Sequence, residues 1–410
     1  MAGGPGAYRI GEEEKREVLE VLEGGYLFRY GTEDDPSFKH KVIDFEREMQ
    51  KMLGLEHVIA TSSGTGSLQC CLAALGIGAG DEVIVPGYTF ISSISSIPLS
   101  NAVPVLAEID ESLTIDPAKI EELISPQTKA IMAVHMLGNP CDLDAIMAIA
   151  KKHDLFVIED ACQALGASYK GKRLGSYGEI AAFSLNTYKT ITAGDGGAVA
   201  TDDDLLYERA FGFHDYGHKA ARMGVEVGNR SMIGMNMRMN ELTGAVALAQ
   251  IRKLDNILTT LRTKKAKLKG MLTGLPNFTF RKINDEAGEC ATLMTMLFDT
   301  SEMAEKFAKT VDCTPIIYSG WHVYNNMEQI INKVTGATAN CPYNCPRFPL
   351  KREYKKHMLP QTDDILSRAI NISIGVVDRG LGSNFGININ SDDDEIERIG
   401  TQIAEIVKSL

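Results

Sequence analysis

The alternation of short β-rich runs with amphipathic stretches between residues 57 and 200 limits the possible folds of this chain most. The runs are rich in Val, Ile and other strand-forming residues, and the stretches between them have the apolar spacing of helices. This alternation predicts βαβ crossovers around a mostly parallel sheet. The strand candidates include residues 83–85, 103–106, 129–134 and 156–158.

Residues suited to ligand binding follow several of these strand candidates. In open α/β sheets, ligands bind at the carboxyl ends of the strands. Ser63, Pro86, His135 and Asp160 all fall at such ends. We therefore expect a single site at this edge of the sheet.

Three features in this series fit a pyridoxal phosphate site. Residues 58–67 pass from a strand through a Ser, Thr and Gly turn into an apolar helix, where backbone amides can bind a phosphate. The run that ends at Asp160 places a carboxylate where it can keep a pyridine nitrogen protonated. Lys189 lies between two alternating apolar runs, 180–185 and 198–201, and is predicted to form the covalent link to the cofactor.

Each of these features also has an ordinary explanation. A single lysine in a Gly-rich stretch is usually a surface residue, and an aspartate after a strand is often a helix cap. The order of phosphate turn, carboxylate and lysine within one strand and helix series favours the cofactor site.

The chain resembles the DegT/DnrJ/StrS family of pyridoxal phosphate-dependent sugar aminotransferases. The resemblance implies the type I aspartate aminotransferase fold: an α/β large domain with a mostly parallel sheet, followed by a smaller α+β domain. Asp195 and Cys162 depart from the Glu and Ala that are commoner in the family. The matching segments are Ser63-Gly64-Thr65, Gly80 to Pro86 with Thr89-Phe90, Glu159 to Ala164, Phe183-Ser184 with Lys189 and Gly194 to Gly197, and Gly234 to Glu241.

The resemblance implies roles for the residues around the cofactor ring. Lys189 would bind pyridoxal 5'-phosphate covalently and then act as the base, and Asp160 would pair with the ring nitrogen. Phe90 would stack on the ring face. Gln163 would touch the other face of the ring or its phenolic oxygen.

The resemblance also implies a phosphate site that two subunits share. Gly64, Thr65 and Ser184 would bind the phosphate from one subunit. Asn236 would enter the site of the neighbouring subunit. The expected working unit is therefore a homodimer with a shared active site.

A narrower resemblance concerns the substrate. Short segments at residues 24–30, 134–136, 214–218 and 321–322 are similar to aminotransferases that make 8-amino-3,8-dideoxyoctulosonate, an acidic lipopolysaccharide sugar. This implies an oxidised 3-deoxy-octulosonate as the amino acceptor and an amino acid, L-glutamate, as the donor.

Five residues are the candidate substrate contacts under this narrower resemblance. Two of them are arginines, whose guanidinium groups can clamp a carboxylate. The second arginine, at position 238, has an alternative role, which is to fix the loop that carries the asparagine. The candidates are Arg29, Tyr30, His214, His218 and Arg238.

Other functions remain open. An aminotransferase that acts on a nucleotide-linked keto sugar or a cyclitol would share every cofactor residue. A sugar dehydratase on the same fold would carry histidine at the lysine position, which Lys189 argues against. A catalytically inactive regulator that only binds the cofactor would not need Lys189, Asp160 and Gln163 together.

Length and composition fit a chain of two domains. We expect a large cofactor-binding domain with an amino-terminal arm at residues 1–255 and a small α+β domain at residues 256–410. A long helix at residues 240–269 is predicted to link the two domains, and in the second part a strand is predicted at residues 292–298 and a helix at residues 301–311. Ser391 is the predicted cap of a final amphipathic helix.

Charge, apolar runs and cysteine spacing exclude several classes of protein. A net charge of −12 argues against nucleic acid as a partner. The apolar stretches are too short to span a membrane, and no signal peptide is evident, so a cytoplasmic location is expected. The eight cysteines lack the spacing of a disulfide scaffold, and Cys341 and Cys345 lack a second ligand pair, so no metal is expected.

Overall fold

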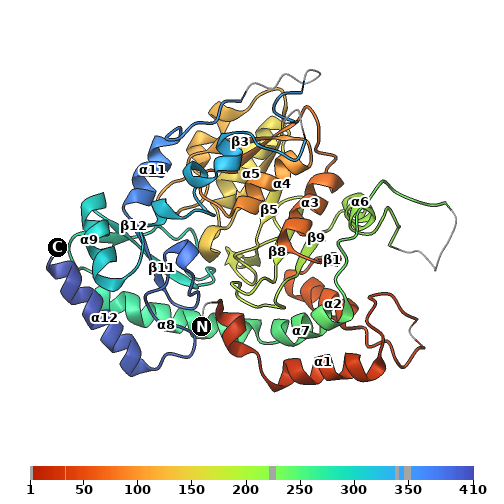
Figure 1. Ribbon diagram of the computed structural model, residues 1–410, viewed down its shortest axis with the longest axis horizontal. Coiled ribbons are helices and arrows are strands. Elements are labelled where there is room, and N and C mark those ends of the chain that lie inside the picture. Colours follow the sequence, from red (N-terminus) through yellow and green to blue (C-terminus); the bar gives the residue numbers. More distant parts are fainter. Residues whose placement is uncertain (1–2, 33, 221–227, 338–340, 346–351) are drawn as a thin grey trace.

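The computed structural model describes residues 3–32, 34–220, 228–337, 341–345 and 352–410. A large sheet of seven strands and a smaller sheet of three strands organise these residues (Figure 1). The large sheet has the strand order β1-β9-β8-β5-β4-β2-β3. Its strands are β1 (His57–Thr61), β2 (Glu82–Pro86), β3 (Val103–Ala107), β4 (Thr128–Val134), β5 (Phe156–Asp160), β8 (Ile180–Ser184) and β9 (Gly197–Thr201).

The large sheet is mostly parallel, as the sequence predicted. Strands β3, β2, β4, β5 and β8 pair in parallel, and only β9 runs antiparallel to its neighbours β8 and β1. Such strands are buried on both faces, which explains continuous apolar runs such as Val83 to Val85. The predicted positions of Ser63, Pro86, His135 and Asp160 at or just beyond strand carboxyl ends are confirmed.

Helices cover both faces of this sheet, and alternate strand residues face one layer or the other. Ile84 and Ile131 belong to one buried cluster, together with helices α2 (Lys41–Leu53), α5 (Leu143–His153) and α8 (Leu254–Leu272). Val83 and Val85 belong to the other, with helices α3 (Gly64–Ala74), α4 (Ile91–Leu99) and α6 (Asp204–His214). This split follows from the two-residue period of a strand.

The smaller sheet has the order β10-β11-β12 and is antiparallel. Thr295 and Asn371, on the neighbouring strands β11 and β12, share a buried hydrogen bond of 2.7 Å. The elements of this part are β10 (Phe278–Phe280), β11 (Leu293–Phe298), β12 (Ala369–Ser373), α9 (Ser301–Val311), α10 (Glu328–Ile331), α11 (Pro360–Ser367) and α12 (Asp393–Lys408).

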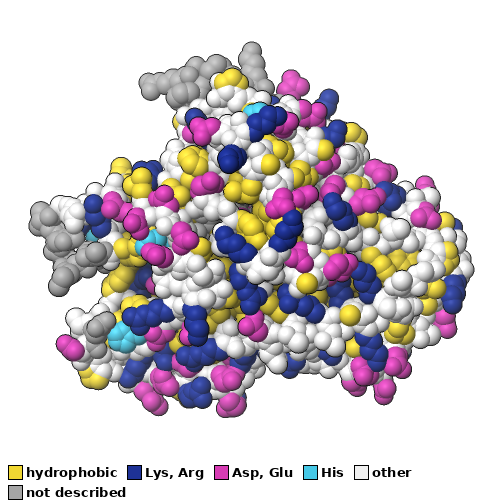
Figure 2. Space-filling view, turned by 180° about the vertical axis from the view of Figure 1, so that it is seen from behind, with side chains coloured by type: hydrophobic (Ala, Val, Ile, Leu, Met, Phe, Trp, Pro, Cys, Tyr) yellow, Lys and Arg dark blue, Asp and Glu magenta, His cyan; other side chains and the backbone are white. Residues whose placement is uncertain are grey.

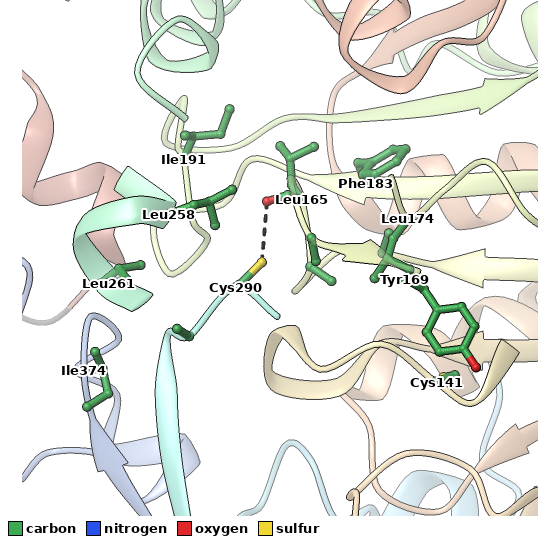
Figure 3. Packing of buried hydrophobic residues seen from close by; sticks show 14 of the residues in the cluster. Cys141, Leu165, Tyr169, Leu174, Phe183, Ile191, Leu258, Leu261, Cys290 and Ile374 are labelled. Atoms are coloured by element: carbon green, nitrogen blue, oxygen red, sulfur yellow. Dashed lines mark hydrogen bonds between the residues drawn. The ribbon is translucent and has the colours of Figure 1, made fainter. Parts of the chain in front are cut away.

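A continuous apolar core joins the parts on either side of residue 255. Leu258 and Leu261 of α8 pack in the same buried cluster as Ile191 and Ile374, and Figure 3 labels these side chains. The Cys290 thiol donates a hydrogen bond to the carbonyl oxygen of Leu165 at 3.6 Å, which is a further contact between the two parts of the chain. The division into domains at residue 255 therefore stays a prediction.

The single long helix predicted at residues 240–269 is wrong. The structure has two helices there, α7 (Glu241–Ile251) and α8, separated by Arg252 and Lys253. Both basic side chains reach back to helix α1 (Glu12–Gly24): Arg252 pairs with Glu17 at 2.7 Å and Lys253 with Glu14 at 2.8 Å. These ion pairs hold the turn, which an apolar periodicity alone does not reveal.

The predicted cap of the last helix is also wrong by one residue. Asp392, rather than Ser391, accepts the hydrogen bond from the Glu395 amide at 2.9 Å. Ser391 is buried, and its hydroxyl accepts from the Asn388 amide in the preceding turn at 3.0 Å. An Asp and a Ser side by side satisfy the same cap pattern, so the sequence could not choose between them.

Acidic and basic side chains are interspersed over the face of the molecule in Figure 2. Within the described residues, no helix is both long and apolar enough to cross a membrane.

Candidate active site

A cavity of about 540 Å³ lies at the carboxyl ends of the large-sheet strands. The turn after β1, the end of β5 and the loop after β8 form one side of it. The carboxyl-terminal part of the chain also contributes to the lining, with Thr292, Leu293, Trp321, His322, Val376, Asp378, Gly380 and Leu381. Seven predicted cofactor residues line the cavity: Gly64, Thr65, Phe90, Asp160, Gln163, Ser184 and Lys189.

Lys189 lies in the loop between β8 and β9, where its amide donates to the Asn186 carbonyl at 2.9 Å. Its ammonium group lies 5.9 Å from the centre of the Phe90 ring. Burial lowers the pKa of this amine, while Cys162, Asp160 and Asp378 oppose the shift. The neutral form of the amine, which is the nucleophile and the base, therefore becomes more accessible.

Asp160 and its neighbour Glu159 point to opposite sides of β5, so only one of the two acids belongs to the cavity. Asp160 accepts from the Ser93 hydroxyl at 2.6 Å and from the Cys162 amide at 3.1 Å. Glu159 is fully buried and accepts from three backbone amides of the loop at residues 175–178. It also contacts the His135 ring at 3.1 Å. Asp160 thus lines the cavity, whereas Glu159 holds the loop at residues 175–178 in place outside it.

The start of helix α3 provides a site for a phosphate group. Ser63 caps the helix by accepting from the Gly66 amide at 3.0 Å, and the first helical amides, of Gly64 and Thr65, have no partner within the helix. A Cβ atom at Gly64 would lie 2.7 Å from the Ser184 side chain, so this turn packs directly on β8. Amides and hydroxyls at a helix start are suited to a phosphate dianion.

Gln163 and Phe90 complete the lining on this side. The Gln163 side-chain oxygen accepts from the Leu137 amide at 3.1 Å, which leaves its NH₂ group as a donor toward the cavity. The Phe90 ring is 37% exposed and provides a flat apolar surface. Together with the lysine, the carboxylate and the phosphate site, these groups fit pyridoxal phosphate.

Asn236 does not line the cavity of its own chain. Its side chain is exposed, and its oxygen accepts from the Arg238 amide at 3.3 Å. The structure therefore leaves the role of Asn236 in a neighbouring subunit as a prediction.

The five predicted substrate contacts also lie outside the cavity lining. Arg29 is buried, and its guanidinium binds Glu46 at 2.8 Å and the Ala60 carbonyl at 3.0 Å. His214 is the last residue of α6 rather than part of a loop, and its ring lies 3.4 Å from Arg29. Because Glu46 already neutralises Arg29, this guanidinium is not presented to a ligand in the cavity.

The other three predicted contacts gather around the buried carboxylate of Asp215. Arg238 forms an ion pair with Asp215, Tyr30 hydrogen-bonds to it, and the His218 ring lies 3.5 Å from it. The Arg238 guanidinium also stacks over Phe28 at 5.3 Å. These contacts favour the alternative role of Arg238, in which it fixes the asparagine loop.

Ser93, His322 and Asp378 are among the cavity residues that the predicted set did not include. Ser93 lies in α4, in a stretch that was considered only for its apolar residues. Its hydroxyl, three residues after Phe90, could have indicated a place near the cofactor. His322 and Asp378 reach the cavity from the carboxyl-terminal part of the chain. His322 belongs to the 321–322 segment of the narrower resemblance but was not among the candidate contacts, and no local motif marks Asp378, because its position depends on how the two parts pack together.

We expect Arg29→Met to lower stability rather than to weaken acceptor binding. Removing one partner of a buried ion pair leaves an uncompensated charge on Glu46, which costs about 3 kcal/mol or more. Urea denaturation measures the free energy of unfolding, and initial rates give KM for the acceptor.

The control is the double change Arg29→Met with Glu46→Gln, which removes the charge but keeps an acceptor for the Ala60 amide. It should recover part of the lost stability. An acceptor KM raised at least about tenfold in Arg29→Met, with unchanged stability, would instead support a carboxylate clamp.

The sequence and the fold both match known aminotransferases. The model of the DegT/DnrJ/EryC1/StrS aminotransferase family matches residues 8–376. A GDP-perosamine synthase of Caulobacter vibrioides is 38% identical over 262 residues, which are 62% of this chain and 65% of that protein. A putative L-glutamine:3-amino-2,3-dideoxy-scyllo-inosose aminotransferase of Streptoalloteichus tenebrarius is 36% identical over 276 residues, 67% of this chain and 65% of that protein. Both alignments span just under two thirds of the relative.

Solved structures agree with this match. A structure of 3-amino-5-hydroxybenzoic acid synthase superposes with a TM-score of 0.79 at 26% identity and covers 100% of both chains. A Bacillus subtilis protein with bound cofactor PMP superposes with a TM-score of 0.74 at 25% identity, over 100% of this chain and 86% of that one. The predicted type I fold and the predicted cofactor are thereby confirmed. The chain belongs to the DegT/DnrJ/EryC1/StrS aminotransferase family.

Proposed function

We propose that this protein transfers an amino group from an amino acid to the carbonyl carbon of a neutral sugar or cyclitol ring. The observation that carries the proposal is the convergence of Lys189, Asp160 and the α3 phosphate site on one cavity. A protein that merely binds the cofactor has no need for a lysine amine of lowered pKa beside a paired carboxylate.

Bound pyridoxal phosphate supplies an aldehyde and an electron-withdrawing ring that can carry an amino group between two substrates. The Lys189 amine would hold the cofactor through its aldehyde and, when free, would move the proton at the reacting carbon. The Asp160 carboxylate, oriented by Ser93 and the Cys162 amide, would hold the proton on the ring nitrogen. Thr65, Gly64 and Ser184 would bind the phosphate and so fix the ring in place.

The charges of the cavity favour an acceptor whose reacting ring is uncharged over an octulosonate, which carries a carboxylate. Among the described residues that line it, Lys189 is the only cation, while Asp160, Asp195 and Asp378 are acids. A sugar carboxylate would find no arginine there, because Arg29 is paired with Glu46. The similarity to a GDP-perosamine synthase and to a cyclitol aminotransferase supports the same choice. A nucleotide-linked keto sugar is the first candidate, and a keto cyclitol is the second.

We also propose that the protein is a homodimer in which Asn236 completes the phosphate site of the partner. Asn236 is exposed and outside its own cavity. On the same loop, Ile233 is 95% exposed and Met235 is 53% exposed. Apolar side chains that project this far are suited to burial against a second subunit.

A half-reaction screen tests the substrate proposal. The protein is first converted to its pyridoxamine form with L-glutamate or L-glutamine and then mixed with one acceptor at a time. The acceptors are GDP-linked 4-keto-6-deoxymannose, a pentahydroxycyclohexanone and an oxidised 3-deoxy-octulosonate. We expect one of the two acceptors with an uncharged ring, the GDP-linked keto sugar or the cyclohexanone, to restore the aldehyde form fastest. Faster turnover of the octulosonate would contradict the proposal of an uncharged ring and leave aminotransfer intact.

Asp160→Asn should slow both half-reactions at least about a hundredfold while it changes the unfolding free energy by about 1 kcal/mol or less. The amide keeps the shape of the carboxylate and can still accept from the Cys162 amide, but it loses the charge. Stopped-flow absorbance and urea denaturation on one sample give both quantities.

The matched control is Glu159→Gln on the adjacent residue of β5. Because Glu159 binds three amides and His135 outside the cavity, this change should mainly lower stability. Rates for Asp160→Asn within tenfold of wild type would exclude the ring-nitrogen role.

Mixed dimers test the shared site. Lys189→Ala and Asn236→Ala chains, each inactive alone, are combined at equal amounts after dissociation. If Asn236 acts in the partner's site, half of the dimers carry one complete site, and activity returns to about a quarter of wild type. Isotope-labelled chains verify the exchange by mass spectrometry. Complete exchange without recovered activity would place Asn236 outside the partner's site.

A further inference from the structure

The carboxyl-terminal side of the cavity contains two polar side chains to which the proposed chemistry assigns no role. Asp378 and His322 both line the cavity. We refer to these two residues as the hydroxyl-binding pair. Both interact electrostatically with Lys189, which places them near the reacting end of the site.

Asp378 presents a carboxylate with spare acceptor capacity. One oxygen accepts from the Gly380 amide at 2.7 Å, which is the only hydrogen bond to this carboxylate from the described residues. Burial raises the pKa of the Asp378 carboxyl, whereas the Gly380 amide and Lys189 favour its charged form. The second oxygen remains open to a donor from a ligand.

His322 presents a second acceptor, and its protonation follows from its hydrogen bonds. The Ser319 hydroxyl donates to the Gly380 carbonyl, so its single proton is used there. The 2.9 Å contact between Ser319 and Nδ1 of His322 must then carry the histidine proton. Burial, and secondarily Lys189, lowers the pKa of His322 to about 3, so the ring is neutral at pH 7. Nε2 is therefore an unprotonated acceptor.

Gly380 joins the two members of the pair. Its amide binds Asp378, and its carbonyl accepts from Ser319, which orients His322. A Cβ atom at this position would lie 3.1 Å from the Asp378 carboxylate, closer than most real contacts, so a glycine suits this position. One glycine residue therefore sets the spacing between two hydrogen-bond acceptors that share a cavity.

An apolar surface lies beside these acceptors. The Trp321 ring is 58% exposed and lies nearly parallel to Phe90, at 26° and 6.4 Å between ring centres. Aromatic faces pack well on the C–H face of a sugar ring, and adjacent acceptors then bind its hydroxyl hydrogens.

We infer that Asp378 and His322 bind the hydroxyl groups next to the carbonyl of the acceptor and thereby select a hydroxylated neutral ring. This inference rests on the proposed amino transfer to such a ring and adds the residues that would discriminate between rings. Two acceptors in a cavity whose described lining includes no arginine bind a donor such as a hydroxyl and repel a carboxylate.

A pair of acceptors that differ by one hydroxyl tests the inference. GDP-linked 4-keto-6-deoxymannose carries a hydroxyl beside its carbonyl, and its 3-deoxy form lacks it. Wild-type protein in the pyridoxamine form should favour the hydroxylated sugar by roughly tenfold to a hundredfold in kcat/KM. The deoxy sugar lacks the hydroxyl and therefore leaves the buried acceptors unpaired. In Asp378→Asn, which turns one acceptor into a donor, the preference should fall to within about threefold.

Asp195→Asn is the matched control, since Asp195 is another acid of the cavity and is bound by Asn186 at 3.0 Å. It should keep the wild-type preference. Trp321 is the only tryptophan of the chain, so its emission reports ligand binding independently of turnover. Titration with each sugar should show the same selectivity, and Trp321→Phe should abolish the signal.

The outcomes separate the inference from the proposed function. Turnover of both GDP-sugars without a preference, or an equal loss in Asp195→Asn, would overturn the hydroxyl-binding pair and leave the function intact. If neither GDP-sugar binds, the same comparison is made with a pentahydroxycyclohexanone and its deoxy form. A preference there that Asp378→Asn removes supports the pair and rejects the nucleotide-linked acceptor. If neither the GDP-sugars nor the cyclohexanones show a preference that Asp378→Asn removes, the inference about Asp378 and His322 is wrong as well.

Discussion

The parallel pairing of β3, β2, β4, β5 and β8 is the constraint on which the rest of the structure depends. Parallel strands end at the same edge, so Asp160 at the end of β5 and Ser184 at the end of β8 become neighbours. Strand β1, which is joined to this series through the antiparallel β9, ends at that edge too and delivers the α3 helix start. The backbone alone thus brings the carboxylate and the phosphate site together.

The carboxyl-terminal part of the chain then closes this edge and sets its electrostatics. It adds Asp378 and the neutral His322 to a lining in which Lys189 is the only described cation. Burial favours the neutral Lys189 amine, while the surrounding acids oppose this effect. The same burial removes water and strengthens each remaining polar contact. Beside the lysine amine, the cavity therefore presents hydrogen-bond acceptors from Asp378 and His322.

Residues that follow strands could be predicted from the sequence, because local pattern determines their position. The cavity lining includes Lys189, Asp160 and Gln163 for this reason. The alternation of runs likewise predicted the parallel sheet, and the exception β9 is a short strand whose direction the pattern does not encode.

Features that depend on distant partners could not be predicted in this way. A short motif around an arginine does not reveal that Glu46, seventeen residues away, neutralises it. Arg29 was therefore predicted to bind a substrate carboxylate, although it lies outside the cavity lining. The same reason applies to His214 and Arg238. Both lie outside the cavity lining, where His214 contacts Arg29 and Arg238 pairs with Asp215. Asp378 lies far beyond the matching motifs and meets Lys189 only after the two parts of the chain pack.

The central claim is that Lys189 is the covalent anchor of the cofactor in a site organised by Asp160. The most direct measurement is borohydride reduction of the loaded protein, followed by proteolysis and mass spectrometry of the labelled peptide. The account predicts a single phosphopyridoxyl group on Lys189, and no label when L-glutamate first converts the cofactor to its amino form. A label on another lysine, or a label on Lys189 that glutamate or any other amino donor fails to prevent, would contradict it.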